Sequence, residues 1–200
     1  RKNALSQGIA GLVTYEVRDI NTVRLEHHKY DIVFAPSSAH HFKALEHIFQ
    51  EVRNSLKPSG LFVLVEYVGP SQFQWTDKQL QMINDLLDIL PVRYRGSVRI
   101  PGLIRERLER HSLEYMDAHD PSEAVRSADI LSVLQRYFTI RERRDYGGTL
   151  LNMLLHDIAG NFDERREDDA AFLGLLCYFE KTLIQEQVLP SDFTFIVAQP

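Results

Sequence analysis

Two adjacent histidines, His40 and His41, are the side chains best suited to proton transfer in this sequence, and they follow the apolar run Ile32 to Ala35. An imidazole has an ordinary pKa of about 6.5, so such a ring can take a proton from a hydroxyl or an amine near neutral pH. Neighbouring side chains point in different directions, and we therefore expect only one of the two rings to face a cleft. The alternative for each ring is packing at a helix start or exposure at the surface.

Other candidate side chains also follow strand-like segments. Glu66 and Tyr67 end the apolar run Leu61 to Val65, where Glu66 could act as a base, orient a substrate or simply cap the strand end. Tyr146 lies in a glycine-flanked turn and could close over a pocket. Trp75 could form an aromatic wall for a substrate, or it could pack an inserted segment onto the body of the domain.

Other kinds of site receive less support from the residues. The pairs His27-His28 and His40-His41 could suggest a metal ion, but no cysteine or acidic residue stands at a ligand spacing from them, so we predict no metal site. The sequence has no Gly-x-Ser-x-Gly elbow, no Walker loop and no Cys-His pair.

The segment from Tyr30 to Pro70 must position the histidines and Glu66. A continuous apolar run at Ile32 to Ala35 predicts a buried strand, and the period of the apolar residues then changes to that of a helix from Ala44 to Leu56. The turn Lys57 to Gly60 ends this helix, and Leu61 to Val65 predicts a second buried strand. Two such strands joined by a helix form a right-handed βαβ unit of a parallel sheet.

The remaining segments predict an α/β, Rossmann-like fold with a mainly parallel sheet and a last strand that is antiparallel. We expect residues 1–73 and 120–200 to form the sheet domain and residues 74–119 to form a helical insert or lid. Besides the βαβ unit, we expect strands over Leu12 to Val17, Phe138 to Arg144 and Phe193 to Ala198. The expected helices are a helix end over 1–11, a helix with a capping box over Thr76 to Leu90, a helix starting at Asp120-Pro121-Ser122-Glu123, and helices over Thr149 to Ile158 and Ala170 to Gln187.

Composition limits the class of protein. The 200 residues are 44% hydrophobic and carry a net charge of −5 with dispersed positive charges, so nucleic-acid binding is not indicated. No apolar run approaches the roughly 20 residues of a membrane span. The single Cys177 excludes an internal disulfide and favours a reducing compartment, here the cytoplasm, and we expect it to be a small core residue.

The ordered set of motifs resembles the second half of class I S-adenosylmethionine-dependent methyltransferases. The resemblance lies in YDIVFAPSSAHHFKALEHIFQEVRNSLKPSGLFVLVEYVGP, with its histidine pair and its LKPSG turn, and in the closing pieces DPSEAVRSADIL, RRDYGG and DFTFIVAQP. It covers about residues 13 to 200, and Ser59 replaces the first glycine of the turn that the family carries. No one of these motifs is diagnostic, but their order is specific.

The resemblance implies S-adenosyl-L-methionine as cofactor and assigns roles to residues. Asp19 matches the position whose carboxylate accepts from the adenine amino group, and the N–H of Ile20 faces the ring; the alternative is an Asp that caps a turn. Ala35, Pro36 and Ser37 match the loop against the cofactor. His40, His41 and Glu66 become the catalytic candidates. Side chains for the acceptor would be Tyr67, Tyr146 and Trp75.

The sequence departs from the family at its start. The glycine-rich cofactor loop and the acidic residue that binds the ribose are absent, and Gly8 to Gly11 has the wrong spacing to replace the loop. We therefore expect an N-terminally truncated domain that begins near the helix before the family's third strand.

Three functions remain open from the sequence. The first is methyl transfer to an oxygen or nitrogen of a small-molecule or saccharide-like acceptor, by a chain that could form a homodimer. The second is a non-catalytic, methyltransferase-like scaffold that binds a partner. The third, an unrelated NAD enzyme, is disfavoured because G-x-G-x-x-G is absent.

Overall fold

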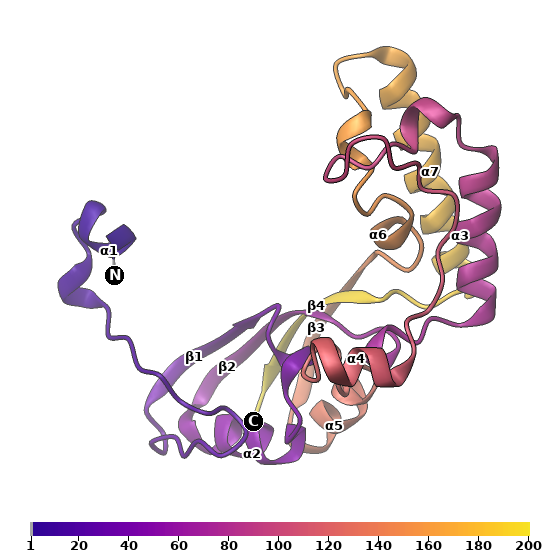
Figure 1. Cartoon of the computed structure of the whole chain (residues 1–200). Coiled ribbons are helices and arrows are strands. Elements are labelled where there is room, and N and C mark those ends of the chain that lie inside the picture. The colour runs from indigo at the N-terminus through magenta and orange to yellow at the C-terminus, as the bar shows by residue number, and fades with distance from the viewer. Residues whose placement is uncertain (1) are drawn as a thin grey trace.

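The computed structural model describes residues 2–200, and its centre is a four-stranded sheet in the order β1-β2-β4-β3 (Figure 1). The strands span Tyr30–Pro36 (β1), Leu56–Tyr67 (β2), Thr139–Gly147 (β3) and Phe193–Gln199 (β4). β1 and β2 are parallel, whereas β4 is antiparallel to both of its neighbours, β2 and β3. The Rossmann-like α/β fold and the antiparallel last strand are therefore confirmed.

The pairing brings the functional segments to one edge of the sheet. Because β2 and β3 are both antiparallel to β4, the carboxyl ends of β1, β2 and β3 lie at the same edge, where β4 begins. Tyr67, at the end of β2, is paired with Phe193, and Gly147, at the end of β3, is paired with the same residue. Ligands of open α/β sheets bind at this carboxyl edge.

Helices α2 (Leu45–Ser55) and α5 (Ile130–Tyr137) cover one face of the sheet (Figure 1). The apolar stripe of α2 buries Leu45, Ile48, Phe49 and Val52, and the Phe49 ring packs edge-on against Phe62 of β2 with 5.8 Å between ring centroids. The βαβ connection is as predicted, but the expectation that its first strand is buried is wrong, because Ile32 and Phe34 of β1 are exposed. In addition, α2 passes directly into β2, which begins earlier than the expected strand and includes the turn sequence Lys57 to Gly60.

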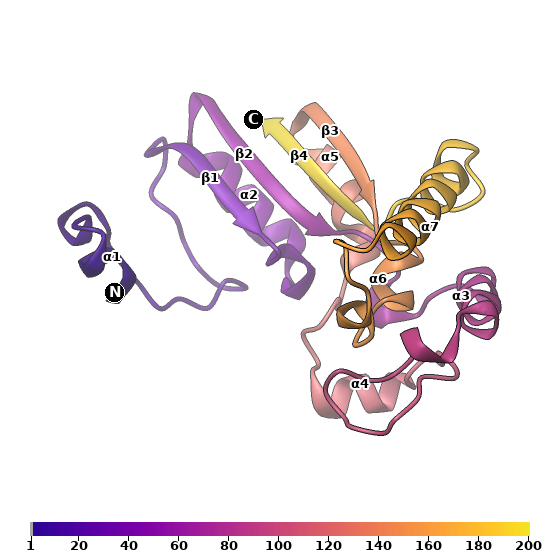
Figure 2. The ribbon, with the colours of Figure 1, turned by 90° about the horizontal axis from the view of Figure 1, so that it is seen from above.

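A second core joins helices from distant parts of the sequence beyond the carboxyl edge (Figures 1 and 2). The predicted capping box is present, because the Thr76 hydroxyl accepts from the Gln79 N–H and the Gln79 side chain accepts from the Thr76 N–H. The helices are α3 (Asp77–Ile89), α6 (Leu151–Leu154) and α7 (Glu167–Gln185), and their buried residues include Ile83, Leu87, Leu150, Leu154 and Leu176.

The expected strand over Leu12 to Val17 is wrong. This segment is extended but unpaired, and it leads from α1 (Lys2–Ser6) and the 3-10 turn Ala10–Leu12 along an arm that lies away from the sheet (Figures 1 and 2). Leu12 and Val17 are fully or almost fully exposed. Alternation alone does not make a strand, because a strand needs a partner to accept its hydrogen bonds.

The helix predicted to start at Asp120 is also wrong. α4 (Leu113–His119) ends there, and α5 begins only at Ile130, after the 3-10 turn Ser127–Asp129. An Asp120 carboxylate oxygen accepts from the Ser122 N–H at 3.3 Å and from its hydroxyl at 3.0 Å, which forms an Asx turn in place of a helix cap. The predicted helix over Thr149 to Ile158 is likewise reduced to α6.

Two further features bear on the sequence predictions. Cys177 is exposed on α7, so the expectation of a core residue is wrong. Within residues 2–200, no helix combines the length and the apolar character that crossing a membrane requires.

Candidate functional site

Glu66 organises the carboxyl edge of the sheet. Its carboxylate is 1% exposed, and one oxygen accepts from the N–H groups of Ser38 at 2.9 Å and Ala39 at 2.5 Å. The other oxygen accepts from the Tyr67 N–H at 2.8 Å and bonds Nδ1 of His40. Glu66 therefore caps the strand end, which was one of the alternatives, and it also fixes the loop and orients a histidine, which the sequence did not predict.

The loop that Glu66 holds begins at the end of β1. Ala35 is buried and Pro36 is exposed, and the Ser37 N–H donates to the Val65 carbonyl at 2.7 Å. Ser37 has a φ of 44°, in the left-handed region that is uncommon for a residue with a side chain. The loop therefore turns sharply beside Glu66 into the 3-10 turn Ala39–His41.

His40 is the predicted catalytic residue with the most strongly polarised surroundings. Burial disfavours its charged form, but the hydrogen bond to Glu66 and the charges of Glu66, Glu123 and Asp120 outweigh burial, so the pKa of His40 is raised above its usual value. If Nδ1 carries the proton that Glu66 accepts, the lone pair of Nε2 points away from Glu66 and is available for chemistry.

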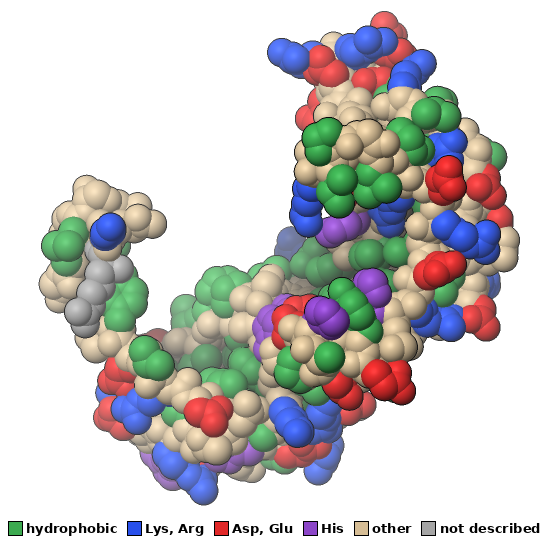
Figure 3. Space-filling model, in the orientation of Figure 1, with side chains coloured by type: hydrophobic (Ala, Val, Ile, Leu, Met, Phe, Trp, Pro, Cys, Tyr) green, Lys and Arg blue, Asp and Glu red, His purple; other side chains and the backbone are tan. Residues whose placement is uncertain are grey.

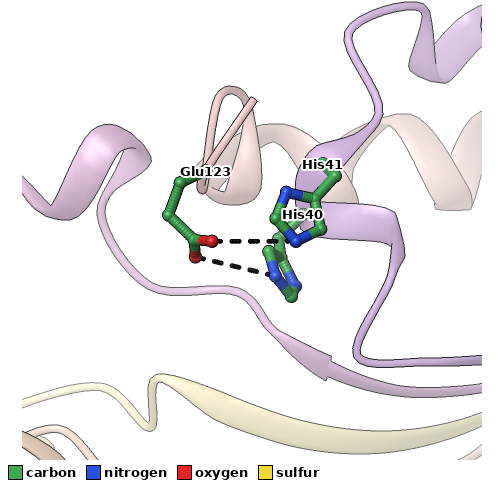
Figure 4. A group of neighbouring side chains, drawn as sticks. All are labelled: His40, His41 and Glu123. Carbon is green, nitrogen blue, oxygen red and sulfur yellow. Dashed lines mark ion pairs between the residues drawn. The ribbon is translucent and has the colours of Figure 1, made fainter. Parts of the chain in front are cut away.

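Glu123 closes the group from the loop after α4 (Figure 4). One of its oxygens lies 3.7 Å from Nε2 of His40 and the other lies 3.7 Å from Nε2 of His41. Nδ1 of His41 faces the carbonyl and the hydroxyl of Ser122, at 3.3 and 3.2 Å. Both rings therefore turn Nε2 toward the same carboxylate.

Asp19 and Ile20 lie in a turn beside this loop, and no strand precedes them. The Asp19 carboxylate accepts from the Asn21 N–H at 2.9 Å, and Asn21 in turn accepts from the N–H groups of Lys43 and Ala44, each at 3.0 Å. The turn is thus tied to the start of α2, next to the histidines, and Asp19 is exposed there. The assumption that Asp19 follows a strand is wrong, but its place at this edge is as expected.

Tyr67 and Trp75 are both only 4% exposed. The Tyr67 hydroxyl donates to the Pro70 carbonyl at 3.1 Å, and burial raises the pKa of this phenol. Trp75 stacks on Phe73, and the Phe73 ring packs against Tyr67. These rings pack in the interior at the end of β2, so Trp75 has a packing position. Because both Tyr67 and Trp75 are buried, neither ring offers much surface to an acceptor.

Tyr146 does reach a surface. It lines an open groove of about 790 Å³ between the end of β3, α6 and α7. The wall of this groove includes Gly147, Glu180 and Phe193, and the Phe193 ring lies 5.3 Å from Tyr67. Figure 3 shows hydrophobic and histidine side chains gathered around the hollow where the sheet meets the helical part. The groove therefore adjoins the predicted site at the same edge.

The sequence reasoning missed Glu123, Ser122 and Glu180. Ser122 lies 81 positions from His41, and the motif DPSE that contains it predicts a helix start. The same motif is compatible with an Asx turn, which would place Glu123 in a loop. Neither interpretation shows that this loop contacts the histidines.

Comparison with known proteins supports the resemblance seen in the sequence. Residues 1–64 match a family model described as a methyltransferase domain. Geranyl diphosphate C-methyltransferase from Streptomyces coelicolor, with Mg²⁺, geranyl diphosphate and S-adenosyl-L-homocysteine, aligns over 99% of this chain and 57% of its own, at 14% identity and a TM-score of 0.50. An S-adenosylmethionine-dependent methyltransferase from Mesorhizobium loti aligns over 100% of this chain and 74% of its own, at 14% identity and a TM-score of 0.48. A search of curated proteins found no match.

Residues 1–64 therefore resemble a methyltransferase domain, and the fold of the chain is similar to that of S-adenosylmethionine-dependent methyltransferases, in agreement with the resemblance seen in the sequence. The Streptomyces enzyme was crystallised with S-adenosyl-L-homocysteine, the product form of that cofactor. The chain spans little more than half of the length of the Streptomyces enzyme.

Proposed function

We propose that the protein transfers a methyl group from S-adenosylmethionine to an oxygen or nitrogen of a small-molecule or saccharide-like acceptor. The observation that carries the proposal is the network of Glu66, which joins the end of β2, the loop after β1 and His40 at the edge where such sheets bind ligands. The turn of Asp19 borders the same loop through Asn21.

The roles of the residues follow from this arrangement. Asp19 would accept from the adenine amino group, with the Ile20 N–H against the ring, and Ala35 to Ser37 would lie along the cofactor near the transferred methyl. Methyl transfer from a sulfonium is an in-line displacement with a good leaving group, so the protein mainly supplies proximity and orientation. We propose that the acceptor is activated at the Nε2 side of the histidine pair.

The groove beside Tyr146 supports an acceptor of small-molecule size, because pockets for such ligands are commonly of about 300–1,000 Å³. We propose that residues 74–119 and the helices α6 and α7 form the acceptor side. We also propose a cytoplasmic protein that does not bind nucleic acid and that could form a homodimer. The absence of a disulfide partner for Cys177 in the sequence supports the reducing compartment.

One observation favours a second candidate, a non-catalytic module that binds a partner protein. Ile32 and Phe34 of β1 are 59% and 58% exposed, and no helix among the described residues covers this face of the sheet (Figure 1). Exposed apolar side chains that lie together are typical of association surfaces. Such a module would need neither the Glu66–His40 pair nor an accessible Asp19.

Calorimetric titration with S-adenosylhomocysteine separates the two candidates. If the protein is an enzyme, the longest form that contains this chain should bind one equivalent with a Kd in the micromolar range, and this product should compete with S-adenosylmethionine. The absence of binding by a folded chain would favour the module.

A further inference from the structure

We propose that His40, His41 and Glu123 form a binding site for one divalent transition-metal cation, for which Zn²⁺ is the best match. The place of this cation beside the acceptor rests on the proposed function, whereas cation binding itself does not. The three side chains each offer one ligand atom, and these atoms all lie within 4.8 Å of one another (Figure 4).

The spacing is close to that of a bound ion. Zn²⁺ binds histidine nitrogen and carboxylate oxygen at about 2.0–2.2 Å, so ligand atoms around a tetrahedral ion lie about 3.4 Å apart. Each Nε2 atom is 3.7 Å from an oxygen of Glu123. These two distances go to different oxygens of Glu123, and one ligand atom from each residue lies within 4.8 Å of the others. A closing of at most about 1.4 Å, which rotation of the side chains can supply, therefore brings three atoms onto one ion.

Outer hydrogen bonds set both rings in the orientation that a ligand needs. A metal-binding histidine donates its other N–H to a carboxylate or a carbonyl, and this bond fixes the tautomer and the ring. Nδ1 of His40 bonds the buried carboxylate of Glu66, and Nδ1 of His41 faces the Ser122 carbonyl. Both Nε2 lone pairs are thereby directed toward Glu123.

The loop that carries Glu123 is held in place independently of the histidine side chains. The Arg126 guanidinium binds both oxygens of Glu46 at 2.7 and 2.9 Å and also the Lys43 carbonyl at 3.1 Å. The Val125 N–H donates to the His40 carbonyl at 3.1 Å. The ligands on the two loops are therefore positioned by backbone contacts and by an ion pair outside the site.

The charge around the site also favours a cation. The Glu123 carboxylate faces both rings, and the carboxylates of Glu66 and Asp120 add negative charge near His40. Imidazole ligands suit Zn²⁺ and its transition-metal neighbours, whereas Mg²⁺ prefers an all-oxygen shell. Three protein ligands leave at least one position open, as in catalytic zinc sites.

The open position gives the cation a function in the proposed reaction. An acceptor hydroxyl bound to the ion would have a lowered pKa and lose its proton to solvent. Its oxygen would then form the bond to the methyl carbon while the sulfur–carbon bond breaks and the electron pair stays on sulfur. In that case the histidines activate the acceptor through the ion.

The chain contains a matched control. His27 and His28 are also adjacent, but their ring centroids are 6.4 Å apart, compared with 4.2 Å for His40 and His41. Among the residues that the structure describes, no carboxylate joins His27 and His28 in a group of potential ligands. A double substitution there removes two surface imidazoles without touching the proposed site.

The test is titration of the chain with ZnCl₂ by calorimetry and with CoCl₂ by visible absorption. We expect one equivalent of Zn²⁺ to bind, and Co²⁺ to give the d–d bands of a site with imidazole ligands. Glu123→Gln should weaken Zn²⁺ binding at least tenfold. Glu66→Gln replaces one of the oxygens that hold the His40 ring and its loop, and it should weaken binding about tenfold to a hundredfold. His27→Gln/His28→Gln should leave the affinity unchanged, and circular dichroism should show that every variant is folded.

Two results would overturn the inference. One is a folded chain that binds no Zn²⁺ or Co²⁺ at one equivalent. The other is binding that survives Glu123→Gln but is lost in His27→Gln/His28→Gln. S-adenosylhomocysteine binding is measured separately: cofactor binding without metal binding removes only this inference, and metal binding without cofactor binding removes only the proposed function.

Discussion

Glu66, at the end of β2, and Glu180, on α7, are two buried carboxylates that each accept hydrogen bonds from three backbone N–H groups. Glu66 accepts from the N–H groups of Ser38, Ala39 and Tyr67, and Glu180 accepts from those of Gly148, Leu150 and Leu151. Each therefore fixes a loop whose backbone donors have no partner in a helix or a sheet.

The two sites differ in what else the carboxylate holds. Glu66 also bonds a histidine ring that faces His41 and Glu123, whereas the hydrogen bonds of Glu180 go only to the backbone. The close fit around Glu180 requires glycine, because a Cβ on Gly147, whose φ is +97°, would collide with its carboxylate. We infer that Glu180 serves folding, whereas Glu66 serves both folding and the site.

The largest expected effect is on stability, from Glu180→Ala. The substitution leaves three N–H groups without an acceptor, and each such group costs about 1–3 kcal/mol when buried, so we expect the free energy of unfolding to fall by about 3–6 kcal/mol. Urea denaturation followed by circular dichroism measures it. Lys181→Ala, at the exposed neighbouring position, is the control, with an expected change of about 0.5 kcal/mol or less. A loss of similar size in both variants would remove the structural role of Glu180.

Glu66→Gln should mainly affect the reaction. The amide cannot hold the His40 ring as the carboxylate does, so we expect the rate of methyl transfer to fall about a hundredfold, within the range for a misplaced acid–base group. Glu180→Gln, in the fraction of protein that stays folded, should keep kcat within about threefold, whereas its place in the wall of the groove allows a change in KM for the acceptor. Equal values of kcat for the two variants would contradict the claim that Glu66, and not Glu180, contributes to the reaction.

A third buried carboxylate, Asp192, sharpens the comparison because it lacks backbone donors. One of its oxygens accepts from the Gln79 side chain at 3.1 Å and the other has no partner among the described residues. Burial raises the pKa of Asp192 to about 7, with Glu180 adding to the rise and the Gln79 bond opposing it.

The sign of the resulting pH dependence follows from this pKa. The native state holds the Asp192 proton more tightly than the unfolded state, so stability should fall as the pH rises from about 4 to about 7. Asp192→Asn removes this decline, and at pH 8 we expect the variant to be more stable by about 1–2 kcal/mol. Thermal unfolding at pH 5 and pH 8 tests this, and a variant that is no more stable at pH 8 would contradict the burial argument.

Asp19→Ala should have the smallest effect. Asp19 is exposed and its side-chain bonds are confined to its own turn, so stability should stay within about 0.5 kcal/mol. Loss of one hydrogen bond to adenine should weaken S-adenosylhomocysteine binding about tenfold. Glu16→Ala, on the exposed arm nearby, is the control. Unchanged affinity would remove Asp19 from the site.

The fold could be predicted where the pattern is local and strong. The continuous apolar runs around Ile32 and Leu64 and the helical stripe between them each predicted an element, so the βαβ unit followed from the sequence. The burial of the first strand did not, because Ile32 and Phe34 are exposed on a face that no described helix covers. The Thr76 capping box was equally local, because both partners lie within one turn. The alternation of Leu12 to Val17 failed as a predictor because its meaning depends on a neighbouring strand.

The candidate site could be predicted only in part. The ends of strands identified Glu66 and the loop with His40, but the histidine cluster depends on Glu123, whose loop reaches the histidines through Arg126 and Glu46. Asp120 forms an Asx turn with Ser122 and does not cap a helix. Both conformations suit the sequence DPSE, and the local sequence does not show which of the two has the lower free energy.

The most direct test of the central claim is a ¹H–¹⁵N NMR titration of the chain with S-adenosylhomocysteine. If the carboxyl edge around Glu66 is half of a cofactor site, the largest amide shifts should fall on residues 19–21, 35–41 and 66–67. Shifts confined to the groove of Tyr146 and Glu180, or the absence of shifts at millimolar ligand, would contradict it.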